Sequence, residues 1–275
     1  MTNSQGATSY LPPAKNTPDG HSYLQARQHD SRSPCPALNT LANHGYIRRS
    51  GEDIGFFELI HALQLVYNLS WVLAFFLTFV GFSISGKVTL STRTENQATW
   101  IQRHIPMPRW RLDLASLSIR GPGKIAHDAS FVHPDFIPSH APDPRLLARF
   151  LSFAPSCHGK SYLPGLSLVN LARYRQIRES ELSSPLNTLH RQVALGECGL
   201  AWAVMRRRSS MERKAFTESA EERDEVITVD CLQKWFGCER LPDDWWNDGG
   251  SRPVKSIGLL EAKRRADHVA KIIGK

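Results

Sequence analysis

Apolar residues recur with a helical period along most of the chain. Between residues 36 and 43, Leu38, Leu41 and Ala42 have the i, i+3, i+4 spacing that places them on one face of a helix. Pro36 suits the first helical position and Gly45 suits the end. Comparable spacing and end signals predict further helices over residues 144–153, 166–179, 188–205, 228–242 and 257–273. No segment shows convincing strand alternation, so the pattern predicts a mostly α fold.

The most hydrophobic segment runs from residue 56 to residue 84. A transmembrane helix needs roughly 20 apolar residues, and this segment is long enough to raise that alternative. However, Glu58, His61 and Gln64 interrupt its first half, and the cleaner stretch that follows is short. We therefore expect a central core helix rather than a membrane anchor. Residues 91–110 are polar, contain two prolines and have no strong period, which predicts a surface loop.

The two ends of the chain differ from its middle. Residues 1–19 are polar and Pro-rich and predict a flexible N-terminal arm, whereas the charged segment 256–275 predicts a C-terminal helix or tail. Residues 20–255 are expected to form a single domain. The arm contains neither the basic nor the apolar stretch of a secretory signal, so we expect an intracellular, cytoplasmic protein.

Composition narrows the class of protein. Hydrophobic residues make up 41% of the chain and charged residues 22%, as in ordinary globular proteins. The net charge of +8 would suit a nucleic acid or an anionic membrane. The basic residues are scattered, however, and their one dense run, residues 206–208, is predicted to be a solvated loop, so we expect no nucleic-acid partner. Five cysteines without a CxxC pair predict neither a disulfide framework nor a structural zinc site.

Cys35 has an unusual setting among these cysteines. It lies between Pro34 and Pro36, at the N-cap of the first predicted helix. Its sulfur there faces the unpaired N–H groups of the first turn and the positive end of the helix dipole, which favour a thiolate, the form that binds metals. The two prolines stiffen the loop and fix the direction of the sulfur. Cys35 is therefore either a reactive or metal-binding cysteine or a buried structural one.

The residues around Cys35 carry a resemblance. The string PCPALNTLANHGYI (residues 34–47) resembles the proximal signature of the fungal haem-thiolate peroxidases, the family of chloroperoxidases and unspecific peroxygenases. The resemblance implies a single-domain, helical, chloroperoxidase-like fold that binds haem b. It also implies that Cys35 is the axial ligand of the haem iron, with Pro34, Pro36, Ala37 and Leu38 beside the cofactor.

Other segments resemble the same family in the same order, over about residues 20–255. The string KIAHDASFVHPD (124–135) looks like the distal segment, LARYRQIRESELSSP (171–185) like the Arg-rich helix, ALGECGLAW (194–202) like the segment with the distal glutamate, and TVDCLQKWFGCERLPDDW (228–245) like the closing helix. By this resemblance Glu197 would move a proton between the oxygens of hydrogen peroxide, His127 would tune that glutamate and Asp128 would orient His127. The fallback carboxylates are Glu179 and Glu181.

One position departs from the family pattern. Ala126 stands where the family has a glutamate that helps to bind a magnesium or manganese ion near a haem propionate. The other family ligands are a backbone carbonyl and a serine, which match His127 and Ser130. Loss of the only charged protein ligand should weaken a site for such a hard cation, so we expect it to be empty or built differently.

The resemblance implies an oxidoreductase that uses hydrogen peroxide on a small organic substrate. Oxygen insertion, one-electron oxidation and halogenation all remain open, as does the oligomeric state, and the predicted intracellular location fits members that act in fungal secondary metabolism. One alternative, motivated by Ala126, is a haem-binding protein with non-peroxidative chemistry such as rearrangement, dehydration or cyclisation. Another is a membrane-anchored scaffold protein, motivated by the apolar run at 57–84 and the basic surface.

Overall fold

The computed structural model describes residues 17–91, 107–154, 164–208 and 225–274. The fold is mostly helical, as predicted. The helices are α1 (Pro36–Asn43), α2 (Phe56–Tyr67), α3 (Trp71–Ser85), α5 (Pro144–Ser152), α6 (Leu168–Ser180), α7 (Thr188–Met205), α9 (Val229–Leu232) and α10 (Leu259–Ile272), with a 3-10 turn η1 (Leu114–Ser118) and a π-helical turn η2 (Gln233–Gly237).

Six short strands form two small antiparallel sheets within the described residues. The first has the order β1-β3-β2, from β1 (Ile54–Gly55), β2 (Lys87–Ser91) and β3 (Met107–Leu112). The second has the order β4-β6-β5, from β4 (Gly165–Leu166), β5 (Arg207–Arg208) and β6 (Glu225–Thr228). These strands were missed because most of them are too short to show alternation. The dense basic run, predicted to be a solvated loop, supplies β5.

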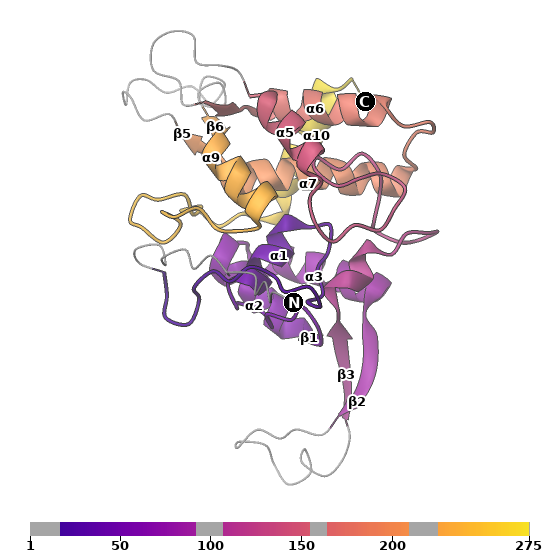
Figure 1. Ribbon diagram of the computed structural model, residues 1–275, viewed down its shortest axis with the longest axis vertical. Helices are drawn as coiled ribbons and strands as arrows, with labels where there is room; N and C mark the ends of the chain where they lie inside the picture. Colours follow the sequence, from indigo (N-terminus) through magenta and orange to yellow (C-terminus); the bar gives the residue numbers. More distant parts are fainter. Residues whose placement is uncertain (1–16, 92–106, 155–163, 209–224, 275) are drawn as a thin grey trace, which may run out of the picture.

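The helices lie in two groups around one core (Figure 1). The N-terminal group contains α1, α2 and α3, and the β2–β3 hairpin extends from it away from the rest of the molecule. The other group contains α5, α6, α7 and α10, with α10 packed along α7 and α6. The turn η2 contacts both α1 and α5 and so connects the two groups. The core between them includes the fully buried side chains of Tyr67, Trp202 and Trp245.

Local sequence signals fix most helix ends. The predicted bounds of α1 and α7 are those observed, and those of α5, α6 and α10 differ by one or two residues. Asp143 begins α5 by accepting hydrogen bonds from the backbone N–H groups of Arg145 and Leu146, and Ser167 and Asn187 begin α6 and α7 in the same way. In the segment 228–242, which was predicted to be one helix, the structure has α9 followed by η2.

The hydrophobic segment 56–84 is not one core helix, so that prediction was wrong. Asn68 adopts a left-handed conformation, with φ of 52°, and ends α2; Ser70 then accepts a hydrogen bond from the Leu73 N–H and begins α3. One side of α3 is also exposed, as at Trp71 and Phe76. In the part of the chain that the structure describes, no helix has both the length and the hydrophobicity needed to cross a bilayer.

The prediction of a surface loop over 91–110 was also wrong at both ends, because Ser91 is the last residue of β2. Residues 107–110 belong to β3, which pairs with β2 so that Val88 lies opposite Trp110 and Leu90 opposite Pro108. The polar residues between the two strands hid the alternation on each side of them. Residues 92–106, the middle of the predicted loop, lie outside the described part of the chain, as do residues 1–16 of the predicted arm.

Candidate active site

Cys35 begins α1, as its sequence setting predicts. It is the N-cap residue, with φ of −98° and ψ of 107°, and Pro36 takes the first helical position. Burial raises the pKa of its thiol to about 11, even though the backbone N–H groups of Leu38 and Ala37 act to lower it. These two N–H groups lie near the Cys35 sulfur, but the Cys35 side chain accepts no capping hydrogen bond from them. Cys35 is therefore a neutral thiol by itself, and a bound metal ion would have to displace its proton.

Buried hydrogen bonds hold the loop before Cys35 in place. The Asn39 side chain, which is fully buried, accepts from the Ser33 N–H at 2.9 Å and donates to the Ser33 carbonyl at 2.7 Å. The Ser33 hydroxyl oxygen in turn accepts from the Cys35 N–H at 3.2 Å. Asn39 Nδ2 also donates to Glu239 Oε1 at 2.6 Å. One asparagine thus joins the loop before Cys35 to the chain segment that follows η2.

A second buried pair strengthens this connection. Arg32 Nη2 donates to Asn43 Oδ1 at 2.7 Å, and Asn43 Nδ2 donates to the Glu239 carbonyl at 3.1 Å. Glu239 has a left-handed backbone, with φ of 50°, and burial raises the pKa of its carboxyl to about 7 against the influence of Asn39 and Arg32. The network leaves the Cys35 loop little freedom to move.

The predicted distal residues His127 and Glu197 meet, although 70 residues separate them. His127 Nε2 lies 3.1 Å from Glu197 Oε2, and His127 Nδ1 lies 2.7 Å from the backbone carbonyl of Asp128. A carbonyl only accepts hydrogen bonds, so Nδ1 carries a proton. Asp128 therefore contacts the ring through its main chain, whereas its carboxylate accepts hydrogen bonds from Arg120 and from the Phe136 N–H.

The His127–Glu197 pair favours its ionised form. Burial disfavours the charge on Glu197, but the charge and hydrogen bond of His127 outweigh burial and lower the pKa of the carboxyl. For His127, burial disfavours the imidazolium, but Glu197 raises the pKa of the ring above its ordinary value. Arg175 lies close enough to act on both groups. The site thus presents a carboxylate stabilised by an adjacent imidazolium.

Glu197 and Cys35 share one environment. The Glu197 side chain is 54% exposed, and His127 contacts its carboxyl at 3.1 Å. The Cys35 side chain is partly exposed, and the negative charge of Glu197 raises the pKa of its thiol. A thiol with an ionised carboxylate within electrostatic range fits the donor set of a haem-thiolate site.

Arginine side chains hold the backbone of the distal segment. Arg175 donates to the Ala129 carbonyl at 3.3 Å, and Arg178 donates to the Ser130 carbonyl at 3.0 Å and to Asp135 Oδ2 at 2.9 Å. Asp135 Oδ1 accepts the Ala129 N–H at 2.6 Å, and Ala129 has a left-handed backbone, with φ of 60°. The segment that carries His127 is therefore fixed by buried guanidinium groups from α6.

Other predicted positions have different surroundings. Ala126 is buried, and within the four described ranges no group of three or more His, Cys, Asp or Glu side chains could hold a metal ion. The fallback carboxylates have arginine partners: Glu179 pairs with Arg175 at 3.1 Å, and Glu181 pairs with Arg149 and Arg178. Pro34, Pro36, Ala37 and Leu38 are partly buried around Cys35, as is Ser130 in the distal segment.

Sequence reasoning missed Asn39, Glu239 and Arg175 as parts of the site. Asn39 lies inside the conspicuous string 34–47, and Arg175 lies in the noted Arg-rich string. Glu239 lies in the noted string 228–245, but its contact with Asn39 spans 200 residues and so leaves no local pattern.

A helical fold with this pairing of a thiol and a carboxylate indicates the class of haem-thiolate enzymes. Residues 21–249 match the family described as "Peroxidase, family 2", and the chain belongs to this family, the fungal haem-thiolate peroxidases.

Several relatives are named for their chemistry. An aromatic peroxygenase of Cyclocybe aegerita is 24% identical over 248 residues, which cover 88% of this chain and 62% of that protein. An aromatic peroxygenase of Coprinellus radians is also 24% identical, over 87% of both chains. The dothistromin biosynthesis peroxidase of Dothistroma septosporum is 39% identical over 71 residues, 26% of this chain and 17% of that one. This chain spans about three fifths of the length of the Cyclocybe protein.

Proposed function

We propose that this protein binds haem through Cys35 and uses hydrogen peroxide to oxidise a small organic substrate. The observation that carries the proposal is the ionised His127–Glu197 pair, whose carboxylate acts electrostatically on Cys35. A haem with a thiolate ligand supplies the electron density that favours cleavage of the O–O bond of a peroxide. The family of the chain and the names of its relatives support the same chemistry and do not favour the non-peroxidative alternative.

Each residue has a defined task in this proposal. Glu197 accepts a proton from hydrogen peroxide at its carboxylate and returns it to the oxygen that leaves as water. His127 keeps Glu197 ionised beforehand, and the Asp128 carbonyl fixes the orientation of the ring. Arg175 and Arg178 hold the distal backbone. Asn39 and Glu239 hold the loop that presents the Cys35 sulfur.

The finer assignments rest on the family. We infer that the cofactor is haem b, held through Cys35, with the residues of the string 34–38 against it. Ala126 stands where the charged ligand would be, so we expect no magnesium or manganese ion at this site. The distal segment is stabilised by Arg178, which donates to the Ser130 carbonyl, and by Arg120, which donates to Asp128. The name of the Dothistroma relative makes a secondary-metabolite pathway the most suitable setting.

The absorption spectrum of haem-loaded protein, reduced and exposed to carbon monoxide, tests the proposal. Wild-type protein is expected to show the strongly red-shifted Soret band of a thiolate ligand, and Cys35→Ala should lose it. Cys238→Ala is the matched control, because Cys238 is an exposed, free cysteine outside the site. A band that is unaffected by Cys35→Ala would contradict thiolate ligation by this residue.

A further inference from the structure

The outward side of α3 is apolar. Val72, Phe76 and Phe79 follow each other at i, i+4 and i+7, and they are 55%, 48% and 46% exposed. Trp71, beside them at the start of the helix, is 54% exposed. A helix that is hydrophobic on every side is ordinarily buried on every side. Within the described residues nothing covers this side, so a large apolar surface faces out.

Aromatic contacts continue this surface along the helix and onto β3. The ring centroids of Trp71 and Phe75 are 5.1 Å apart, those of Phe75 and Phe79 are 5.9 Å apart, and those of Phe79 and Trp110 are 6.1 Å apart. The row of rings therefore runs from the first residue of α3 to the hairpin. Neighbouring rings in this row therefore pack against one another.

The β2–β3 hairpin extends the same surface. Directly opposite residues of antiparallel strands point to one face, so Val88 and Leu90 lie on the face of Trp110. Val88 is 69% exposed and Leu90 is 72% exposed. The opposite face carries Lys87, Thr89, Arg109 and Arg111. We call the joint apolar surface the aromatic face; it consists of Trp71, Val72, Phe75, Phe76, Phe79, Val88 and Leu90.

Charge distinguishes between possible partners of the aromatic face. The described residues 59–91 and 107–112 contain three basic residues, Lys87, Arg109 and Arg111, and no acidic residue. Glu58 lies immediately outside these ranges, and Asp113 and Asp53 pair with Lys87 and Arg111. The whole chain has a net charge of +8, so two copies repel each other, whereas an anionic bilayer attracts each copy.

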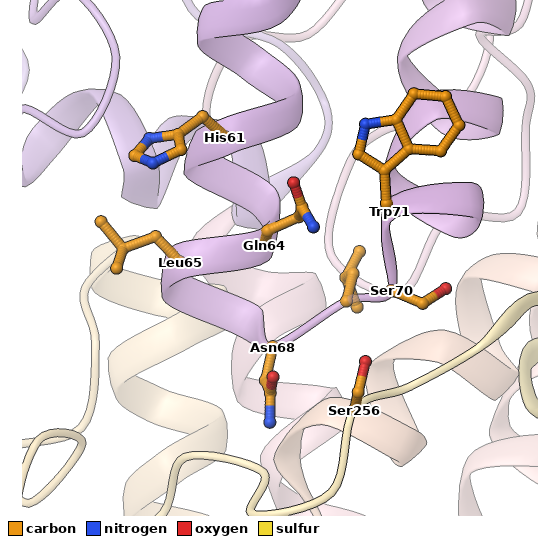
Figure 2. Close-up of a pocket in the computed structure, with 8 residues that line it drawn as sticks. His61, Gln64, Leu65, Asn68, Ser70, Trp71 and Ser256 are labelled. Atoms are coloured by element: carbon orange, nitrogen blue, oxygen red, sulfur yellow. The ribbon is translucent and has the colours of Figure 1, made fainter.

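A shallow recess of about 580 Å³ adjoins the aromatic face at the start of α3. Its lining combines the polar side chains of Gln64, Asn68, Ser70 and Ser256 with the apolar side chains of Leu65 and Leu69. Trp71 belongs both to this recess and to the aromatic face (Figure 2). Tryptophan is enriched where a protein passes from the acyl region of a bilayer to the headgroups. Trp71 therefore lies at the end of the aromatic face, next to the polar side chains of Asn68 and Ser70.

We propose that the aromatic face docks on the surface of an anionic lipid bilayer. The rings and the hairpin side chains enter the boundary between acyl chains and headgroups, and the basic residues of the hairpin remain among the headgroups. With its 15 residues, α3 is roughly 22 Å long, shorter than the ~30 Å of a bilayer core. It therefore lies in the plane of the membrane. The proposal is independent of the chemistry proposed for Cys35.

Vesicle co-sedimentation of the full chain tests the docking surface. Wild-type protein should bind vesicles of equal parts phosphatidylcholine and phosphatidylserine more strongly than phosphatidylcholine alone, and added salt should weaken the binding. Phe76→Gln should lower the partition coefficient by about tenfold, because a large buried side chain is lost from the bilayer. The combined change Val88→Thr with Leu90→Thr should have an effect of similar size.

Val169→Gln is the matched control. Val169 lies on α6, in the other helix group, and is 39% exposed, so its replacement should leave vesicle binding unchanged (Figure 1). Thermal unfolding of each variant verifies that it folds. Equal binding to both kinds of vesicle, or binding that Phe76→Gln and the hairpin variant do not change, would overturn the proposal. So would a wild-type dimer in solution that Phe76→Gln converts to a monomer while no vesicle binding is seen.

Discussion

The two sides of the candidate active site are built in opposite ways. The Cys35 side comes mostly from residues 32–43, joined by Glu239, and its supporting side chains Ser33, Asn39 and Asn43 are at most 2% exposed. The distal side is assembled from a loop and from α7, and its central carboxylate, Glu197, is 54% exposed. One side is thus closed around its polar groups, and the other opens toward water.

This difference follows from what each side has to do. A metal ligand must be held in one position, and a fully satisfied buried network does this because no member can move without leaving another unpaired. A group that exchanges protons with a small reactant must stay reachable, so Glu197 is held from one side, through His127. Changes on the Cys35 side should therefore affect stability, and changes on the distal side should affect the rate.

Replacement of Glu197 should give the largest effect. Glu197→Gln keeps the shape of the side chain but cannot take up a proton, so peroxide-driven turnover should fall by about 10²–10⁴-fold. Steady-state oxidation of a test phenol measures the rate. The Cys35-dependent Soret band and the unfolding temperature should stay close to those of wild type.

Glu52→Gln provides the control for this prediction, because Glu52 is an exposed carboxylate remote from His127. It should retain full turnover. If Glu197→Gln also retained full turnover, another group would carry the proton. The distal side could then no longer be described as the reactive side of the site.

The sequence predicted the position of Cys35 better than it predicted the side chains that hold the site in place. The string 34–47 gave the bounds of α1 and the N-cap position of Cys35, because proline and glycine signals act locally. His127 and Glu197 were found only through resemblance, since neither residue is unusual in its own segment. The arginine supports were hidden because a guanidinium buried against backbone carbonyls, as at Arg175, leaves no local pattern. The break at Asn68 was missed because one left-handed residue is enough to end a helix.

Loss of Asn39 should be the largest effect on stability. Asn39→Ala leaves the Ser33 N–H, the Ser33 carbonyl and the Glu239 carboxyl without their partner, all of them buried. The free energy of unfolding should fall by about 3–5 kcal/mol, measured by urea denaturation. The Soret band of the haem-loaded variant should also broaden, because the Cys35 loop becomes less ordered.

Asn187→Ala is the comparison for Asn39→Ala. Asn187 is also an asparagine that accepts a backbone N–H, but it does so at the exposed start of α7. Its loss should cost only about 1 kcal/mol, the usual value for an N-cap. Equal costs at the two sites would show that the buried network around Cys35 adds no stability of its own.

The last predicted effect is a pH dependence of stability that arises at Glu239. Burial raises the pKa of its carboxyl from 4.5 to about 7 in the folded protein. Below pH 4.5 both states hold the proton; between 4.5 and 7 the unfolded chain releases it first, so stability falls as pH rises. This contribution amounts to about 3 kcal/mol at most. Glu239→Gln keeps an oxygen for Asn39 but does not titrate, so it should remove the decline.

The difference in unfolding free energy between wild type and Glu239→Gln at each pH is more informative than the pH dependence of either protein alone. Burial lowers the pKa of both His44 and His133 to about 4, so these rings make stability rise over much of the same pH range. Their contribution cancels when urea unfolding of the variant is subtracted from that of wild type, pH by pH. The difference should grow between pH 5 and 7 in favour of the variant and then become constant. A difference without any pH dependence would mean that the carboxyl is ionised in the folded state, and that Arg32 compensates for its burial.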